Sequence, residues 1–415
     1  MKATIISIGN ELLNGKTVNS NATFIGGQLY EIGIVTEQIL TIRDDADEIA
    51  GSLQNALSKN DVIIVTGGLG PTHDDITKKV VADFFESELV FDATVMQAVE
   101  ERFRKRGLKM PEVNRNQALV PDKARLINNP VGTAPGMHFH ESGKHVFVLP
   151  GVPREMKAQM QGDIIPLLQS LTNTGRIDVH FYRTTGITES KLYEKCQALF
   201  QQYSEYEIAF LPKFTGVDIR IAVKESAARA VPFSEFETTF YQIAGKYIYT
   251  KGNKELEEAV GDILREKEMT LAVAESCTGG LIGHKITNIA GSSEYYLGGI
   301  LPYSNENKIR FLDVRAESLE QYGAVSDVVA KEMAAGARRN IGSDIALSTT
   351  GIAGPGGATP EKPVGLLYVG FATAEKVVAR KFQLAGDRLI NKQQGAQFAL
   401  ELLRRELMGI ETGAV

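Results

Sequence analysis

The sequence predicts an α/β protein in which two three-layer α/β domains are joined by a small α+β domain. In both halves of the chain, apolar strand-like runs alternate with amphipathic helical segments, which is typical of sheets covered by helices on both faces. The stretch between the halves has the order βαββαβ instead, and 415 residues are long for a single domain. We therefore expect domains at 1–172, 173–251 and 252–415, with 251–254 as the second linker.

The first domain alternates strands and helices along its whole length. The run Val62-Ile63-Ile64-Val65 is apolar throughout, as expected of a central parallel strand buried on both faces. Asp92 precedes a long polar-faced segment and is expected to cap it. Strands are expected at 3–8, 35–42, 61–66 and 144–149, and helices at 20–32, 47–58, 77–85, 92–106 and 153–171.

The other two domains differ in pattern. The middle one shows no catalytic constellation, so a connector or dimerisation role is expected. Its strands are predicted at 179–184, 208–212, 217–223 and 246–249, with helices at 189–200 and 232–243. In the third domain, strands are predicted at 270–274, 295–301, 344–350, 364–374 and 377–384, with helices at 256–267, 279–289, 304–312, 327–340 and 387–407.

Composition excludes several classes of protein. A net charge of −6 gives no general attraction to nucleic acid. Two cysteines, Cys196 and Cys277, rule out a disulfide framework and a cysteine-rich zinc site. Neither a signal peptide nor a membrane-spanning run is recognisable, so the expected location is the cytoplasm.

The most informative segment is Ala274-Glu275-Ser276-Cys277-Thr278-Gly279-Gly280, which joins a strand to a helix. Ser276 and Thr278 stand where a helix needs capping oxygens, and Gly279 and Gly280 permit close approach to the backbone. The N–H groups at a helix start favour an anion or an oxyanion. The segment also holds a hydroxyl and a thiol, either of which can serve as a nucleophile.

Further polar segments follow other strands of this domain, at 303–308, 349–357 and 386–388. Ligands of open α/β sheets bind at such strand ends. With no histidine in these loops, Lys308 is the candidate base for Ser276, and Tyr303 a candidate proton relay. N–H groups at 277–279 can form an oxyanion hole, and Arg388 can clamp a phosphate or carboxylate. Together these residues suggest metal-free amide hydrolysis of an anionic small molecule.

Each of these residues also has a simpler interpretation. Ser276 can be a helix cap, Cys277 a small buried apolar residue, and Lys308 a solvated surface charge. The glycine-rich stretch 351–357 can be an ordinary turn, and Arg388 can pair with Asp387.

The first domain has its own loops at strand ends. Backbone N–H groups of the glycine-rich loop 66–75 can face a phosphate, although the loop is neither a Walker loop nor a dinucleotide fingerprint. Asp74 and Asp75 can hold a divalent cation, with Glu11 as a third carboxylate, or they can simply cap a helix. The loops 133–136 and 149–155 are expected around the same pocket. The candidate nucleotide-binding residues are Gly9, Asn10, Glu11, Gly67, Gly68, Gly70, Thr72, Pro150 and Gly151.

The loop Gly67-Gly68-Leu69-Gly70-Pro71-Thr72-His73-Asp74-Asp75 resembles that of molybdopterin-binding (MoaB/MogA-like) domains. The segments around Ser276, Tyr303, Thr350 and Arg388 resemble the C-terminal nicotinamide-nucleotide amidohydrolase domain of the competence/damage-inducible protein A (CinA) family. The domain order also resembles that of full-length CinA, so the resemblance covers essentially the whole chain.

For the third domain, the resemblance implies hydrolysis of nicotinamide mononucleotide to nicotinate mononucleotide and ammonia, without a cofactor. Ser276 would be the nucleophile, and Tyr303 and Lys308 would transfer protons. The implied substrate-binding residues are Thr278, Gly279, Gly280, Thr350, Gly351 and Arg388.

For the first domain, the resemblance implies a metal-dependent ADP-ribose pyrophosphatase that uses Mg²⁺, Mn²⁺ or Co²⁺ at Asp74, Asp75 and Glu11. A pterin- or nucleotide-binding module without turnover is the alternative, with only one domain active. The middle domain would be KH-like, but it lacks a Gly-x-x-Gly clamp, so no nucleic-acid partner is expected. No membrane partner is expected either, because no apolar run is long enough to span a bilayer. A homodimer is expected from the resemblance.

Overall fold

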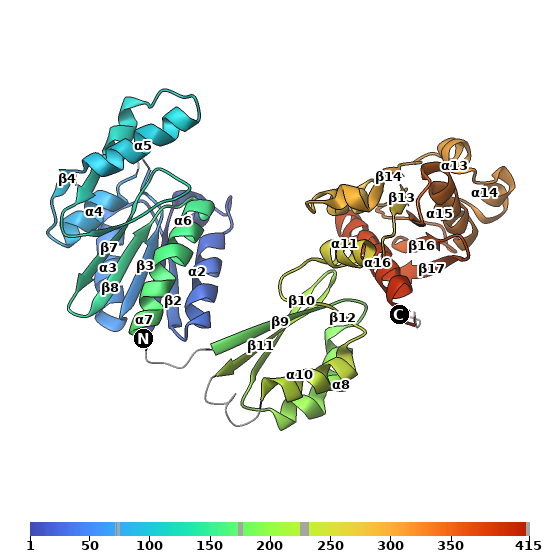
Figure 1. Cartoon of the computed structure of the whole chain (residues 1–415), viewed down its shortest axis with the longest axis horizontal. Helices are drawn as coiled ribbons and strands as arrows, with labels where there is room; N and C mark the ends of the chain where they lie inside the picture. The colour runs from blue at the N-terminus through green and yellow to red at the C-terminus, as the bar shows by residue number, and fades with distance from the viewer. Residues whose placement is uncertain (71, 73–74, 173–176, 225–231, 412–415) are drawn as a thin grey trace. The chain divides into compact units, whose positions relative to one another are not determined.

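The computed structural model describes residues 1–70, 72, 75–172, 177–224 and 232–411 (Figure 1). Its contacts divide the chain into two compact units, one built from the chain up to Asp178 and the other mainly from the chain after it. The middle segment therefore packs as one unit with the C-terminal domain. The predicted fold class is confirmed: two α/β domains flank a small α+β domain.

The N-terminal sheet has six strands in the order β2-β1-β3-β8-β7-β6. Its first four strands are parallel, whereas β7 and β6 run antiparallel to their neighbours. The expected parallel sheet is thus a mixed one, because Ser142 and Gly143, both with positive φ, form a two-residue turn that returns the chain beside β7. The strands are β1 (Lys2–Ile8), β2 (Val35–Ile42), β3 (Val62–Thr66), β4 (Leu89–Phe91), β5 (Leu119–Pro121), β6 (Arg125–Ile127), β7 (Gly136–Glu141) and β8 (Lys144–Leu149).

Alternation along β3 builds a core on each side of this sheet. Val62 and Ile64 pack in the cluster that contains α2, α6 and α7, while Ile63 and Val65 pack with α3 and α4. Figure 1 shows α2, α6 and α7 together on one face. The helices are α1 (Asn10–Leu13), α2 (Ser20–Glu31), α3 (Ala46–Lys59), α4 (Thr77–Phe84), α5 (Ala93–Lys105), η1 (Glu112–Ala118), α6 (Pro153–Gln159), η2 (Met160–Ile164) and α7 (Ile165–Leu171).

Two helix predictions in this domain have different outcomes. Asp92 caps α5 as predicted, because its carboxylate accepts the N–H groups of Thr94 and Val95. The single helix predicted over 153–171 is instead interrupted by the π-helical turn η2. Pro166, near the start of α7, has no N–H to donate, and the widened turn accommodates that loss.

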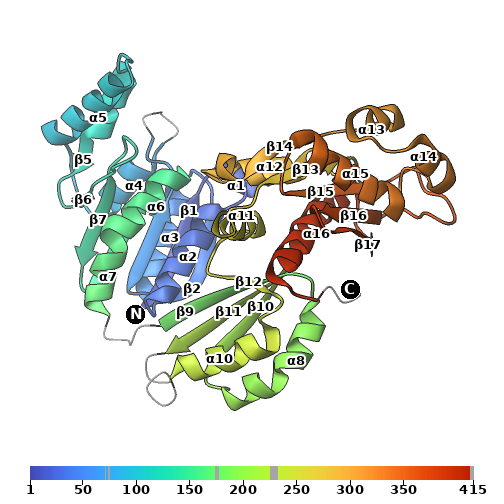
Figure 2. The same cartoon turned by 45° about the vertical axis from the view of Figure 1, so that its right-hand side comes forward.

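The middle domain is a four-stranded sheet, in the order β10-β11-β9-β12, with two helices on one face. Figure 2 shows α8 and α10 side by side beneath the sheet. Tyr182, Phe236 and Phe240 lie at the centre of an aromatic-rich core between the layers. The elements are β9 (Ile177–Thr184), α8 (Glu189–Gln202), β10 (Glu207–Lys213), β11 (Gly216–Lys224), α10 (Phe233–Ala244) and β12 (Ile248–Lys251).

The C-terminal sheet has the order β14-β13-β15-β16-β17, with β14, β13 and β15 parallel and the last two strands antiparallel. The parallel strands therefore end at one edge, where the predicted site segments follow them. The strands are β13 (Leu271–Glu275), β14 (Tyr296–Ile300), β15 (Ile345–Gly351), β16 (Leu366–Ala372) and β17 (Val377–Gln383). The helices are α11 (Leu256–Glu266), α12 (Leu281–Thr287), η3 (Ser292–Glu294), α13 (Asn305–Leu312), α14 (Ala316–Tyr322), α15 (Asp327–Ile341) and α16 (Arg388–Met408).

Both faces of β13 are buried, but by different side chains. Leu271 and Val273 face the cluster that contains α11, α12 and α16, whereas Ala272 and Ala274 face α13 and α15. The small alanines leave room for α15 to lie close to the sheet. The helix α14, which the sequence pattern did not predict, follows α13 on this second side.

A buried ion-pair cluster fastens the middle domain to α16. Glu401 accepts hydrogen bonds from Arg404 at 2.7 and 3.0 Å and from Arg405 at 2.5 Å. Arg404 also donates to the carbonyls of Lys246 (2.7 Å) and Ile248 (3.4 Å) at the start of β12. One carboxylate thus orients two guanidinium groups, one of which is bound to the backbone of the middle domain.

Within the described ranges, no helix combines the length and apolar character needed to cross a bilayer.

Candidate active site at the carboxyl ends of β13, β14 and β15

The turn after β13 is organised by Glu275. Alternation along the strand places Glu275 on the same face as Leu271 and Val273, which is the face that α12 covers. Its side chain is buried, and its carboxylate accepts the N–H groups of Gly280 (3.0 Å), Ile282 (3.1 Å) and Gly283 (2.9 Å). The carboxylate therefore satisfies the free donors at the start of α12 and complements the helix dipole.

This arrangement corrects the prediction that Ser276 and Thr278 cap the helix. The N-cap position is Gly280, in the left-handed region (φ 91°), and no N-cap side chain bonds the helix. The Thr278 hydroxyl instead lies 2.7 Å from that of Thr349, fully buried. Since Glu275 takes the Gly280 N–H, the turn's backbone donors available to an oxyanion are those at Cys277 to Gly279.

Lys308 lies buried beside this turn. Its ammonium donates to the carbonyls of Pro302 (2.9 Å) and Tyr303 (3.3 Å), and its side chain is almost fully excluded from solvent. Burial lowers the pKa of Lys308, although the nearby Cys277 and Glu306 oppose this shift. The interpretation of Lys308 as a solvated surface charge is therefore wrong. Within the described residues, no hydrogen bond joins the Ser276 hydroxyl to Lys308.

Cys277 is a partly buried residue that packs against the hydrophobic core, and its sulfur has the character of a thiol rather than of a thiolate. Burial raises the pKa of its thiol to about 12, against smaller opposing effects of nearby N–H groups and of Thr349. The thiol is therefore protonated at neutral pH. Ser276 keeps its place as the candidate nucleophile of this turn.

Tyr303 and Arg388 meet across the mouth of the site. An Arg388 Nη2–H group lies 3.3 Å from the Tyr303 hydroxyl, and Nη1 donates to the Gly354 carbonyl at 2.7 Å. The expected alternative pairing with Asp387 does not form, because the Asp387 carboxylate caps α16 through the N–H groups of Leu389 and Ile390. Arg388 is therefore an exposed guanidinium that forms no ion pair with a carboxylate of the described residues.

Two further residues predicted to bind substrate, Thr350 and Gly351, make packing contacts within the domain. Thr350 is buried and donates to the carbonyl of Ala324 at 2.7 Å. A Cβ at Gly351 would lie 2.6 Å from the Leu366 carbonyl and 3.2 Å from the Cys277 sulfur, so glycine is needed for this close approach. Thr350 and Gly351 thus fix the end of β15 against its neighbours.

Sequence analysis missed Lys392. A Cβ built on Gly279 would lie 3.4 Å from the Lys392 Nζ atom, so this ammonium stands over the turn. Lys392 and Cys277 also line one small cavity. Lys392 follows Arg388 by four residues on α16, and this helical spacing places both cations on one face.

Candidate nucleotide site of the N-terminal domain

The glycines of the loop after β3 are required by the packing of the chain on itself. A Cβ at Gly67 (φ 116°) would lie 2.1 Å from the Ile8 carbonyl oxygen, and one at Gly68 (φ 64°) 2.1 Å from the Thr77 hydroxyl. The Gly67 N–H donates to the Leu149 carbonyl, so it is not available to a phosphate. At Gly70, a Cβ would lie 2.4 Å from a carboxylate oxygen of Asp75.

Acidic side chains gather at this end of the sheet. The Asp75 carboxylate accepts the N–H of Thr72, and Asp44 accepts the N–H of Asn10 at 3.1 Å. Burial raises the pKa of Asp44, and the negative charges of Glu11 and Asp75 add to this effect. Asp44 is a carboxylate that sequence analysis missed. Asp74 lies outside the described residues, and the described part contains no group of three side chains placed to hold a metal ion.

Lys78 provides a cation beside the same loop. Burial lowers its pKa to about 8, whereas the nearby Asp75 favours the charged form. Its amine donates to the Asn116 carbonyl. Sequence analysis missed Lys78 because a lysine in the first turn of a predicted helix is usually exposed.

Glu11 and Gly151 line one cavity of about 100 Å³ at the ends of β1 and β3. Asn21 fixes its wall by donating to the Gly151 carbonyl at 2.8 Å, and Thr66 donates to the Pro150 carbonyl at 3.1 Å. The Gly9 position lies against the Glu11 carboxylate, because a Cβ there would come within 2.6 Å of it. The structure thus brings the predicted residues Gly9, Glu11, Pro150 and Gly151 together.

Comparison with known proteins

The folds and sites define a protein with a molybdopterin-binding-type domain, a KH-like domain and a C-terminal α/β domain with a buried lysine at its strand ends. Family models agree with this description. The model "Probable molybdopterin binding domain" matches residues 4–170, "Damage-inducible protein CinA KH domain" matches 180–250, and "CinA C-terminal domain" matches 253–407.

The chain belongs to the CinA family. A CinA-like protein of Chloroherpeton thalassium is 44% identical over 98% of this chain and 99% of its own length. A putative competence-damage inducible protein of Caldicellulosiruptor saccharolyticus is 41% identical over 98% of this chain and 100% of its own length. A solved structure of the protein CinA from Thermoplasma acidophilum, described as of unknown function, is 38% identical; it covers 39% of this chain and 94% of its own, with a TM-score of 0.36.

Replacement of Glu275 by glutamine tests its part in the turn. Its carboxylate accepts three N–H groups, and an amide can serve them only with one oxygen. We expect Glu275→Gln to lower stability by about 2 kcal/mol, the scale of charge-assisted hydrogen bonds, measured as the loss in thermal or urea unfolding. The exposed Glu317→Gln is the matched control, and equal stability of the two variants would contradict the assigned role.

Proposed function

We propose that the C-terminal domain hydrolyses nicotinamide mononucleotide to nicotinate mononucleotide and ammonia. The observation that carries this proposal is the buried amine of Lys308 beside the turn that holds Ser276. A lysine with a lowered pKa can be neutral at working pH and can then accept a proton from a serine hydroxyl. This arrangement needs no histidine.

In the proposed reaction, the Ser276 oxygen attacks the carboxamide carbon while the Lys308 amine takes the hydroxyl proton. The N–H groups of the turn at Cys277 to Gly279 stabilise the oxyanion. Collapse of this intermediate expels ammonia, which takes its proton from Lys308. Water then attacks the acyl-enzyme with Lys308 as base, giving the carboxylate and restoring Ser276.

Cations near the turn would select an anionic substrate. Arg388 and Lys392 present two positive charges on one face of α16, and a phosphate group matches them in charge. Tyr303, held by Arg388, would contact the substrate and assist proton transfer. With the phosphate held by these cations, the carboxamide of the substrate would be directed toward Ser276.

Substitution of the two neighbours in the turn separates the candidate nucleophiles. We expect Ser276→Ala to reduce ammonia release from nicotinamide mononucleotide by at least ~10³-fold, as for loss of other serine nucleophiles. Cys277→Ala, the matched control, should retain most of the activity because the partly buried thiol is protonated at neutral pH. The reverse pattern would assign the reaction to the thiol.

The pH profile tests Lys308 as the base. Activity requires the neutral amine, so kcat/KM should rise with pH through the Lys308 pKa, which lies below the ordinary 10.5 of lysine. Lys308→Arg keeps the charge permanently and should reduce kcat by roughly 10²-fold or more. Lys285→Arg, whose ion pair with Glu257 tolerates the exchange, is the control. A folded Lys308→Arg protein with an unchanged profile would remove Lys308 from the reaction.

A second activity is proposed for the N-terminal domain, namely cleavage of ADP-ribose with a divalent cation. The gathering of Glu11, Asp44 and Asp75 at one sheet edge supports it, because carboxylate oxygens suit hard cations. Glu11, Asp75 and the predicted Asp74 would hold the cation, which would polarise a phosphate oxygen when bound. Lys78 would balance phosphate charge. A binding module without turnover remains the alternative, and a homodimer remains part of the proposal.

Turnover of ADP-ribose by the full-length chain decides between these two alternatives. We expect AMP formation with Mn²⁺ that EDTA abolishes and that Asp75→Asn strongly reduces. Asp83→Asn, an exposed change on the same helix, should leave it unchanged. Binding of ADP-ribose without AMP formation would favour the binding module.

A further inference from the structure

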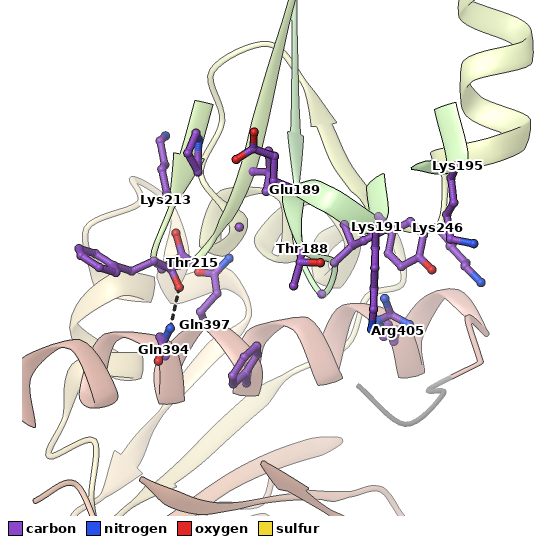
Figure 3. A pocket seen from close by; sticks show the side chains of 18 of the residues that line it. Thr188, Glu189, Lys191, Lys195, Lys213, Thr215, Lys246, Gln394, Gln397 and Arg405 are labelled. Carbon is purple, nitrogen blue, oxygen red and sulfur yellow. Dashed lines mark hydrogen bonds between the residues drawn. The ribbon is translucent and has the colours of Figure 1, made fainter. Parts of the chain in front are cut away.

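A pocket of about 400 Å³ lies between the middle domain and α16, and the residues that line it differ from those proposed for catalysis or substrate binding. Its walls come from the β9–α8 loop, the start of α8, the β10–β11 turn and one side of α16. Figure 3 shows Gln394 and Gln397 rising from α16 beneath Thr215, with Lys191, Lys195, Lys246 and Arg405 farther along. The volume is in the range of small-molecule sites.

One end of this pocket carries more cationic than acidic groups. Lys191 and Lys195 lie one helical turn apart on α8, and Lys246 precedes β12. These three lysines form no ion pair with any described residue, unlike Lys213, which pairs with Asp218. Arg405 is held in the wall by Glu401 and by the carbonyl of Glu411. Such a group of unpaired lysines favours an anion with several oxygens.

The other end offers groups that suit a flat heterocycle. Gln397 lines the pocket and is buried as a residue, with 4% of its surface exposed. Gln394 donates to the Phe214 carbonyl at 3.0 Å, while its amide oxygen is buried without a partner. Buried amide oxygens normally accept a hydrogen bond, so the Gln394 oxygen, with the Gln397 amide beside it, predicts a polar ligand edge. The rings of Phe214 and Phe398 supply apolar surface beside them.

We propose that this pocket binds a nucleoside 5′-phosphate, with its base against Gln394 and Gln397 and its phosphate at Lys191, Lys195 and Lys246. An inorganic phosphate would fill only a fraction of the volume and would leave the amides unpaired. A nucleoside without phosphate would leave the lysines unneutralised. The site is separate from both proposed catalytic sites and does not depend on either activity.

The site joins the two domains of one unit. The β9–α8 loop contacts α16 closely, since a Cβ at Gly186 would lie 3.1 Å from a guanidinium nitrogen of Arg405. A ligand seated there touches the middle domain through its phosphate and α16 through its base. Because α16 also carries Arg388 and Lys392, just before Gln394, the ligand contacts the same helix that the proposed catalytic site uses.

Calorimetric titration of AMP into the full-length protein tests the proposal. We expect AMP to bind at least tenfold more tightly than adenosine or inorganic phosphate. The double variant Lys191→Gln/Lys195→Gln should weaken AMP binding at least tenfold, whereas the control Lys267→Gln/Lys381→Gln, with two exposed lysines elsewhere in the unit, should stay within twofold of the wild type. Ser276→Ala and Asp75→Asn should both retain this binding.

A second variant keeps the test decisive if the double variant does not fold. Gln397→Leu removes only the amide, so AMP binding should weaken while that of inorganic phosphate does not change. The proposal is overturned if AMP does not bind at millimolar concentration, or if both pocket variants bind it like the wild type. Tighter binding of a single-stranded oligonucleotide than of AMP would assign the pocket to nucleic acid instead.

Discussion

The turn that carries the proposed nucleophile of the C-terminal domain depends on one buried carboxylate. Glu275 ends β13 and at the same time binds three N–H groups at the start of α12. Strand and helix are thereby held in a fixed relation, and the residues between them are confined to a tight turn. Ser276 is placed by that constraint, as are the N–H groups proposed for the oxyanion. A water-exposed carboxylate would hold the turn less firmly, because solvent would compete for the same donors.

A second buried carboxylate, Glu401, has a comparable role in the C-terminal half of α16. Glu401 orients Arg404 toward the backbone of the middle domain and Arg405 toward the pocket beneath the β9–α8 loop. Burying such charges is costly unless each is paired, and here each guanidinium has both a carboxylate and a carbonyl. Desolvation of these charges costs free energy, but the hydrogen bonds fix the positions of Arg404 and Arg405. The position of Arg405 in turn shapes the wall of the pocket.

Periodicity in the sequence was sufficient for the buried parallel strands, because β13 and β3 are predicted from apolar runs with clear flanks, but β6 and β7 of the N-terminal sheet were not predicted. It was insufficient for strand direction, since the two-residue turn at Ser142 and Gly143 is a local feature that decides the sheet's order. The candidate site was found through residue types at strand ends. Its organising residue was not, because Glu275 looks like any charged residue near a loop until alternation along β13 assigns its face.

The glycines of the two turns show why the availability of backbone N–H groups could not be predicted from the sequence. In sequence, the glycines after β3 and β13 suggest backbone exposed to a phosphate. In the structure, Gly67 and Gly68 lie against Ile8 and Thr77, and the Gly280 N–H is held by Glu275. Anion binding must therefore rest on side chains to a greater extent than the loops suggested. Lys78 and Lys392 fit that requirement, whereas Lys308, whose pKa is lowered by burial as that of Lys78 is, suits a proton acceptor instead. A lysine whose pKa is lowered by burial, close to the loop that follows a strand, is thus a feature that the two α/β domains share.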